Sequence, residues 1–189
     1  MRCFLRKFTP AVAAFVLIFS WTASQSAAES DADQLDELFA QLQEPLDGDW
    51  QSLQSQIEKL WSRSGSDSMD LLLERGRKAI EDGDYPKAVE HLTALTDHAP
   101  GFAEGWNARA TAFFLMKKYG LSISDIQKTL ALNPRHFGAL VGLGQIYEEL
   151  DDPEAALRAY EAAQTIHPAR PDILQSVERL RDQTKGQSL

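Results

Sequence analysis

The stretch "GALVGLGQIYEELDDPEAALRAYEAAQTIHP", residues 138–168, decides how this chain folds. Its apolar residues recur every three or four positions from Leu140 to Tyr147, which predicts an amphipathic helix. An Asp-Asp-Pro triplet then interrupts the pattern, and Asp152 ahead of Pro153 is a typical helix start. A second helical pattern follows and ends before the final proline. The stretch therefore predicts two helices joined by a tight turn.

The same plan occurs three times along the chain. Prolines recur every 34 residues at Pro100, Pro134 and Pro168, and no insertion is needed to align the three copies. A helix pair of this size cannot bury its apolar face alone, so consecutive pairs must stack. The sequence therefore predicts an all-α fold, an α-solenoid of three 34-residue helix–turn–helix repeats at 69–102, 103–136 and 137–170.

Three glycines within seven positions, Gly138, Gly142 and Gly144, raise the question of a phosphate-binding loop. Such a loop needs a strand that turns into a helix, and no strand pattern precedes these residues. Gly144 instead continues the 34-residue series of Gly76 and Ala110, where a small residue lets two helices approach closely. We therefore interpret these glycines as part of helix packing.

The second unit carries Trp106, Ala110, Tyr119 and Pro134 at spacings that resemble the tetratricopeptide repeat. The segments "FAEGWNARATAFFLMKKYGLSISDIQKTLALNP" and "GALVGLGQIYEELDDPEAALRAYEAAQTIHP" are similar to that consensus, and the resemblance covers 69–170. It implies a right-handed superhelix whose first helices line a concave groove for a peptide or partner protein.

Departures from the family pattern are modest. Ser122 and Thr129 replace expected alanines, and Lys117-Lys118 replaces the usual Gly-Asp turn of the second repeat. The segment "LWSRSGSDSMDLLLERG" is also similar to uncharacterised exported repeat proteins of Gram-negative bacteria, a likeness that implies no activity.

The resemblance implies which positions face the groove, with Gly138 and Gly142 at or near its edge. The implied partner-binding residues are Asp70, Leu73, Arg77, Ile80, Glu81, Glu104, Asn107, Thr111, Phe114, Leu115, Val141, Gln145, Glu148 and Glu149.

Carboxylates outnumber the single arginine in this set, so we expect a partner segment with basic and apolar side chains. The alternative is that these residues form only a solvated face. Some family members clamp a carboxylate-ended peptide with lysines, arginines and asparagines. Only Arg77 and Asn107 suit such a clamp, which is therefore disfavoured.

Apolar stripes flank the repeats on both sides. The segment 29–68 contains two amphipathic patterns and a polar linker, and we expect it to cap the first repeat. The segment 171–189 predicts a C-terminal capping helix and tail. Trp50 and Trp61 lie on one face of the second N-terminal pattern, so a second interface through them, for docking or dimerisation, is the alternative.

The N-terminus has the composition of a secretory signal peptide. Basic residues precede an apolar run from about Ala11 to Trp21, and small residues follow up to Ala28. A membrane-spanning helix needs about 20 apolar residues, so we expect a signal at 1–28 cleaved near Ala28 rather than a retained anchor. The only cysteine, Cys3, lies in this segment. Together with the absence of an ER-retention tail, this favours a bacterial periplasm.

Cleavage would change the formal net charge from −9 to −12, which argues against nucleic acid as a partner. No nucleotide, metal or hydrolase motif occurs, so we expect no cofactor, no metal and no enzyme activity. The turn "EDGD" at 81–84 lacks the spacing of a calcium loop. We expect His91, His98, His136 and His167 to be solvated or locally hydrogen-bonded.

The sequence is compatible with two functions. The first is a non-catalytic periplasmic scaffold or adaptor that binds a peptide or protein in its groove, in envelope assembly or the maturation of exported proteins. The second is a structural subunit that oligomerises through its N-terminal helices, with a homo-oligomer as one outcome.

Overall fold

The computed structural model describes residues 31–44 and 49–186. The chain divides into two units after Glu37, and each is considered by itself. The described part of the first unit, 31–37, is helical. The expected signal peptide and its cleavage site near Ala28 lie outside the described residues.

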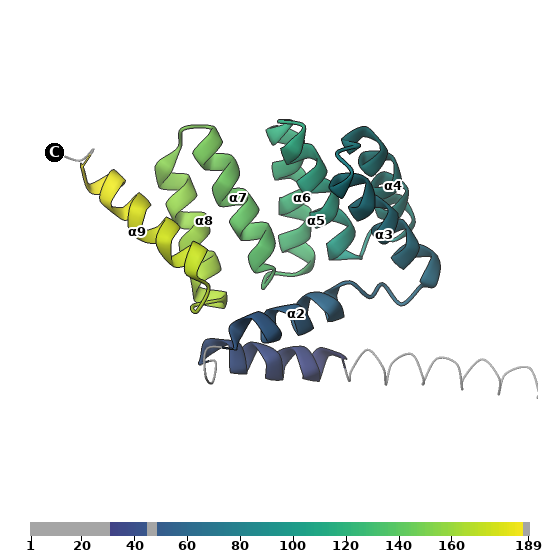
Figure 1. Cartoon of the computed structure of the whole chain (residues 1–189), viewed down its shortest axis with the longest axis horizontal. Coiled ribbons are helices and arrows are strands. Elements are labelled where there is room, and N and C mark those ends of the chain that lie inside the picture. The colour runs from purple at the N-terminus through teal and green to yellow at the C-terminus, as the bar shows by residue number, and fades with distance from the viewer. Residues whose placement is uncertain (1–30, 45–48, 187–189) are drawn as a thin grey trace, which may run out of the picture. The chain divides into compact units, whose positions relative to one another are not determined.

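Helices make up the second unit, which begins at Leu38. After the helical residues 38–43, the described helices follow one another along the chain without an intervening strand (Figure 1). They are α2 (Trp50–Trp61), α3 (Asp67–Glu81), α4 (Tyr85–His98), α5 (Ala103–Leu115), α6 (Tyr119–Leu132), α7 (Phe137–Glu149), α8 (Pro153–Ile166) and α9 (Pro171–Gly186). The all-α, helical-repeat fold predicted from the sequence is confirmed.

Small residues allow the two helices of a repeat to pack closely. A Cβ atom added to Gly144 in α7 would lie 2.7 Å from a ring carbon of Tyr160 in α8. A Cβ added to Gly76 in α3 would lie 2.5 Å from Leu92 in α4. Ala110 holds the equivalent position in α5, and its carbonyl accepts a hydrogen bond from the Ser122 hydroxyl at 2.8 Å. The predicted packing role of this series is therefore confirmed by geometry.

The turn inside each repeat has the same backbone conformation in all three copies. Gly83, Lys117 and Asp151 occupy equivalent places with φ of 76°, 56° and 57°. The next amide in each turn donates to the carbonyl five residues back, at 2.8 to 2.9 Å, as in helices that end in a left-handed residue. The turn at Lys117 therefore forms although its residue type departs from the family pattern.

Apolar clusters between successive helix pairs form the core. Leu73, Leu92 and Leu95 are buried together in the first repeat with Ala108 and Ala112 of the second. A buried ion pair joins the two helices of the second repeat, because Arg109 of α5 donates two hydrogen bonds to the Asp125 carboxylate of α6 at 2.7 and 2.9 Å.

The same arginine donates to Thr96 of α4 at 2.9 Å, so it connects the two repeats directly. At the C-terminal end, α9 covers α8 through Ile173, Val177 and Leu180, each at most 1% exposed.

The N-terminal helices of the second unit do not cover the first repeat, which differs from the predicted cap. Trp61 of α2 contacts His136 and Phe137 at the start of α7, and Trp50 contacts His167 at the end of α8. The aromatic rings of His136, Phe137 and His167 therefore provide the surface on which the two indole rings pack.

Within the described ranges, no helix combines the length and the apolar composition needed to span a bilayer.

Gly144→Leu tests the close packing of α7 on α8. The larger side chain cannot fit beside Tyr160, so we expect a loss of about 3 kcal/mol in the free energy of unfolding, measured by urea denaturation. Gly120→Leu is the matched control, because a Cβ at this exposed α6 position meets no atom within 4 Å. Equal stability of the two variants would contradict the assigned packing.

Candidate functional site

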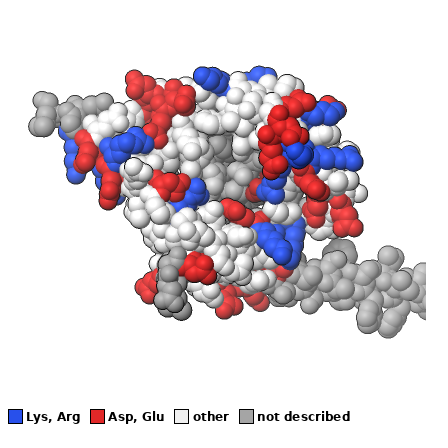
Figure 2. Space-filling view, in the orientation of Figure 1, with Lys and Arg blue, Asp and Glu red and all other residues white. Residues whose placement is uncertain are grey.

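A groove runs along the first helices of the three repeats, α3, α5 and α7. It consists of three adjoining hollows that share lining residues: Arg77 links the first to the second, and Asn107 and Gly138 link the second to the third. Figure 2 shows the hollow in this face of the molecule, with charged side chains around an uncharged centre. Most residues predicted to line a groove are therefore brought together.

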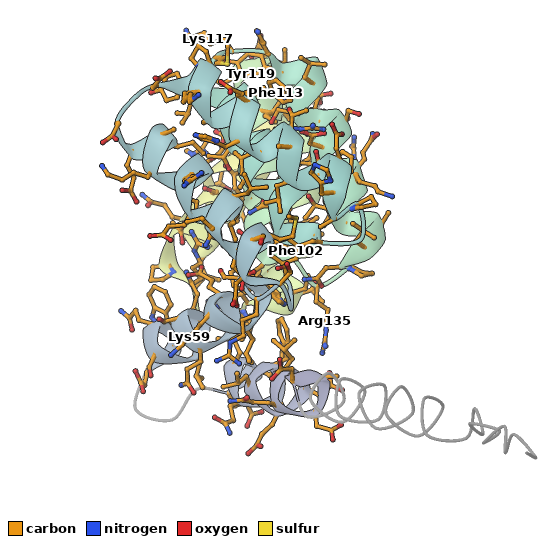
Figure 3. The ribbon with its side chains drawn as sticks, turned by 90° about the vertical axis from the view of Figure 1, so that its right-hand side faces the viewer. Lys59, Phe102, Phe113, Lys117, Tyr119 and Arg135 are labelled. Carbon is orange, nitrogen blue, oxygen red and sulfur yellow. The ribbon has the colours of Figure 1, made fainter. Side chains whose placement is uncertain are left out.

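The second hollow has a volume of about 400 Å³ and is bounded by residues of α2. Lys59, Trp61 and Ser62 form one wall, and groove residues of all three repeats form the others. The Trp61 ring stacks on the ring of His136 with centroids 4.5 Å apart and an interplanar angle of 21°. Thus α2 borders the middle hollow of the groove, and its Lys59 lies at the end of the repeat helices opposite the turns that carry Lys117 and Tyr119 (Figure 3).

A buried carboxylate lies directly behind this wall. Glu104 of α5 is 7% exposed and accepts hydrogen bonds from Arg77 of α3 at 2.5 Å and from His136 at 2.8 Å. Arg77 also donates to the Ser62 hydroxyl at 3.0 Å. The carboxylate therefore connects three repeats and the end of the N-terminal segment.

The hydrogen bonds define how His136 is protonated. Its Nδ1 accepts from the amide of Ala139 at 3.1 Å and so caps α7. The proton therefore resides on Nε2, which donates to Glu104. Burial opposes ionisation of Glu104, but the bond from His136 and the charge of Arg77 hold the pKa of this carboxyl below its usual value.

The third hollow is a recess of about 240 Å³ between the second and third repeats, and we call it the central recess. Helices α5, α6 and α7 supply its floor and walls, and Arg170 lies at its rim. The guanidinium of Arg170 is held by two hydrogen bonds to Asp172, at 2.8 and 2.9 Å.

Acidic residues gather at the other side of the groove, on α3. Asp70, Glu74 and Glu81 line a hollow of about 460 Å³ together with the cations Arg77 and Lys78. We call these three carboxylates the α3 acidic strip. Glu74 and Glu81 are exposed, whereas Asp70 accepts two hydrogen bonds from Ser64.

Three of the carboxylates predicted to face the groove have partners within the protein, so they contribute less to a partner's binding than the residue types suggested. Glu104 is buried in its ion pair, and Glu148 is bound by Tyr160 and Arg179. Glu149 accepts from the Tyr119 hydroxyl at 2.9 Å. No carboxylate lines the recess between the second and third repeats, whereas the α3 hollow is lined by the exposed Glu74 and Glu81.

The apolar residues that were predicted to face the groove lie in three different environments. Leu73 and Ile80 pack into the core of the first repeat, although Leu73 also lines the α3 hollow. Phe114 and Val141 line the central recess, as do the predicted polar residues Asn107, Thr111 and Gln145. Leu115 is 40% exposed and lines none of the three hollows.

Neither tryptophan of α2 forms the free second interface that the sequence left open. Both rings are partly buried against the repeats, Trp61 on His136 and Trp50 on His167. The expectation of solvated or locally hydrogen-bonded histidines holds in part. His136 and His167 are 3% and 0% exposed and so are not solvated, but His136 does accept a local hydrogen bond from the Ala139 amide. Their positions next to Pro134 and Pro168 gave no signal of burial, because the covering helix comes from a distant part of the sequence.

His167 lies in a nearly apolar environment. Its Nε2 lies 3.1 Å from Oε1 of Gln54 in α2, and its Nδ1 is buried without a hydrogen-bond partner. Trp50 and Phe137 cover the ring. Burial, followed by the nearby charge of Arg170, lowers the pKa of His167 to about 4.

Among residues 31–44 and 49–186, no group of three or more histidine, cysteine, aspartate or glutamate side chains is arranged to hold a metal ion.

Acid should weaken the contact between α2 and the repeats. The pKa of His167 is lower in the folded chain, about 4, than its usual 6.5, so the unfolded chain takes up the proton first as pH falls. Stability from this group is complete above pH 6.5 and falls by up to about 3 kcal/mol as pH drops toward 4.

His167→Asn removes the titration and places at 167 the residue that the second repeat has at Asn133. Urea denaturation at pH 7, 5.5 and 4.5 should show a smaller loss for this variant than for the unchanged chain, with exposed His98→Asn as the control. A pH dependence that is the same in all three proteins would refute the assignment.

The tetratricopeptide repeat family matches residues 73–125 and 116–171. A TPR repeat-containing protein of Rhizobium etli is 36% identical over 163 residues, which cover 86% of this chain and 80% of that protein.

Two solved structures have the same fold. The first TPR domain of Spaghetti (RPAP3), bound to an HSP90 peptide, is 25% identical with a TM-score of 0.60, covering 64% of this chain and 95% of that one. MamA is 21% identical with a TM-score of 0.59, covering 74% and 85%. The chain therefore belongs to the tetratricopeptide repeat family, whose fold is a protein-interaction module.

Proposed function

We propose that this protein is a non-catalytic scaffold or adaptor that binds an extended segment of a partner protein in the groove of α3, α5 and α7. The observation that carries the proposal is the continuity of the three hollows along these helices. The α2 wall borders the middle hollow, so a bound segment that follows the groove passes beside Trp61.

Charge distribution supports a partner with both apolar and basic side chains. The exposed carboxylates of Glu74 and Glu81 attract cations at the α3 side. The recess of α5, α6 and α7 is lined by no carboxylate and favours uncharged groups. The related RPAP3 domain was solved with an HSP90 peptide, which supports peptide binding as the mode of interaction here.

The proposed location is the bacterial periplasm, after cleavage of a signal near Ala28, in envelope assembly or the maturation of exported proteins. The order of basic, apolar and small residues at the N-terminus supports export. N-terminal sequencing of the protein from cell fractions tests this proposal, and a chain that keeps its first residues in the cytoplasm would refute it.

Charge reversal of the α3 acidic strip tests groove binding. We expect Glu74→Lys with Glu81→Lys to reduce capture of partners from a periplasmic extract at least tenfold, because like charges then meet. Quantitative mass spectrometry of the captured proteins provides the measurement.

The control carries the same charge change on exposed residues of the second helices, Asp97→Lys with Glu154→Lys. A general electrostatic effect would lower capture equally in both double variants and would contradict groove binding. Circular dichroism of both proteins verifies that the helices remain intact.

A further inference from the structure

The central recess is lined in part by residues buried between α5 and α6. Its floor is formed by Ala110, Ile126 and Ser122, which belong to the packed interface between α5 and α6. Phe114 and Val141 form apolar walls. Its volume of about 240 Å³ is below the range of about 300–1,000 Å³ typical of pockets for whole small ligands. The size therefore suits a single side chain of a longer molecule.

Polar side chains gain little inside this recess. The Ser122 hydroxyl already donates to the Ala110 carbonyl, and the Thr111 hydroxyl donates to the Asn107 carbonyl at 3.1 Å. The single charged lining residue, Arg170, is paired with Asp172. A buried charge or unpaired polar group would lose its water without replacement. An apolar side chain has no such cost and buries its surface favourably.

Gly142 keeps the recess open. A Cβ at this position would lie 3.8 Å from the Ile126 side chain, an ordinary van der Waals contact, so helix packing does not require glycine here. Gly144, two residues later, is different because its Cβ would overlap Tyr160. A glycine inside a helix costs up to about 1 kcal/mol relative to alanine. At position 142 the glycine therefore leaves open space above Ile126, and no close helix contact explains its presence.

We propose that the recess receives one aliphatic side chain of the bound partner segment, of leucine, isoleucine or methionine size. This inference rests on the proposed groove function and adds the chemical identity of the anchoring residue. The α3 acidic strip lies to one side of the recess, so a basic residue of the same segment lies at a fixed spacing from the aliphatic one. The side-chain amides of Asn107 and Gln145 also line the recess and provide polar contacts for the segment's backbone.

A phage-displayed library of random heptapeptides is the probe. Panning on the unchanged chain should enrich peptides with one invariant aliphatic position and a basic residue at constant spacing. Fluorescence anisotropy of one enriched peptide then measures affinity. Replacement of its aliphatic residue by asparagine should weaken binding at least tenfold.

Protein variants separate the recess from the groove as a whole. Gly142→Leu fills the recess and should weaken the same peptide at least tenfold, whereas Gly120→Leu should leave its affinity unchanged. Gly142→Ala provides a fold check, since it should raise the melting temperature through helix propensity while it weakens the peptide less than leucine does.

The possible results distinguish failure of the recess proposal from failure of the groove proposal. If the enriched peptides lack a common aliphatic position, or bind Gly142→Leu with full affinity, the recess does not receive the anchor. In that case, weaker binding by Glu74→Lys with Glu81→Lys retains the groove function. If the library yields no binder, or if neither Gly142→Leu nor the charge-reversed protein affects the enriched peptides, both proposals fail.

Discussion

The buried Glu104 carboxylate is the constraint on which the groove depends. Its two oxygens are bound by Arg77 of the first repeat and by His136 at the start of the third repeat's α7. Trp61 lies flat on that histidine, and Ser62 accepts from that arginine. A buried carboxylate needs both partners, because loss of either leaves an uncompensated charge. Three repeats and α2 therefore share one hydrogen-bonded centre.

This centre determines what the groove can offer a partner. It engages the Glu104 carboxylate and the His136 ring inside the protein, so neither group is available to a partner in the groove. It also holds α2 as a wall of the middle hollow, with the α3 acidic strip on one side and the recess of α5, α6 and α7 on the other. Similar repeats are found in proteins with different partners, so binding preference must come from such local differences and not from the fold.

Sequence periodicity predicted the repeat fold, because the 34-residue series of Gly76, Ala110 and Gly144 reports local helix packing. The family resemblance also identified most residues of the groove. It could not show that Glu104, Glu148 and Glu149 are engaged, since their partners lie in other helices. The sequence also could not predict where α2 packs, because an amphipathic pattern indicates that a helix has a buried face but not which surface covers that face.

Hydrogen–deuterium exchange of α2 provides the most direct test that one buried carboxylate unites the N-terminal helix and the repeats. In the unchanged chain, amides of 53–61 should be protected, since an isolated helix of this length is marginal in water. In Glu104→Ala they should lose protection together with the start of α7, while the distant α9 keeps its own. Unprotected α2 amides in the unchanged chain, or protection that Glu104→Ala leaves intact, would contradict this account.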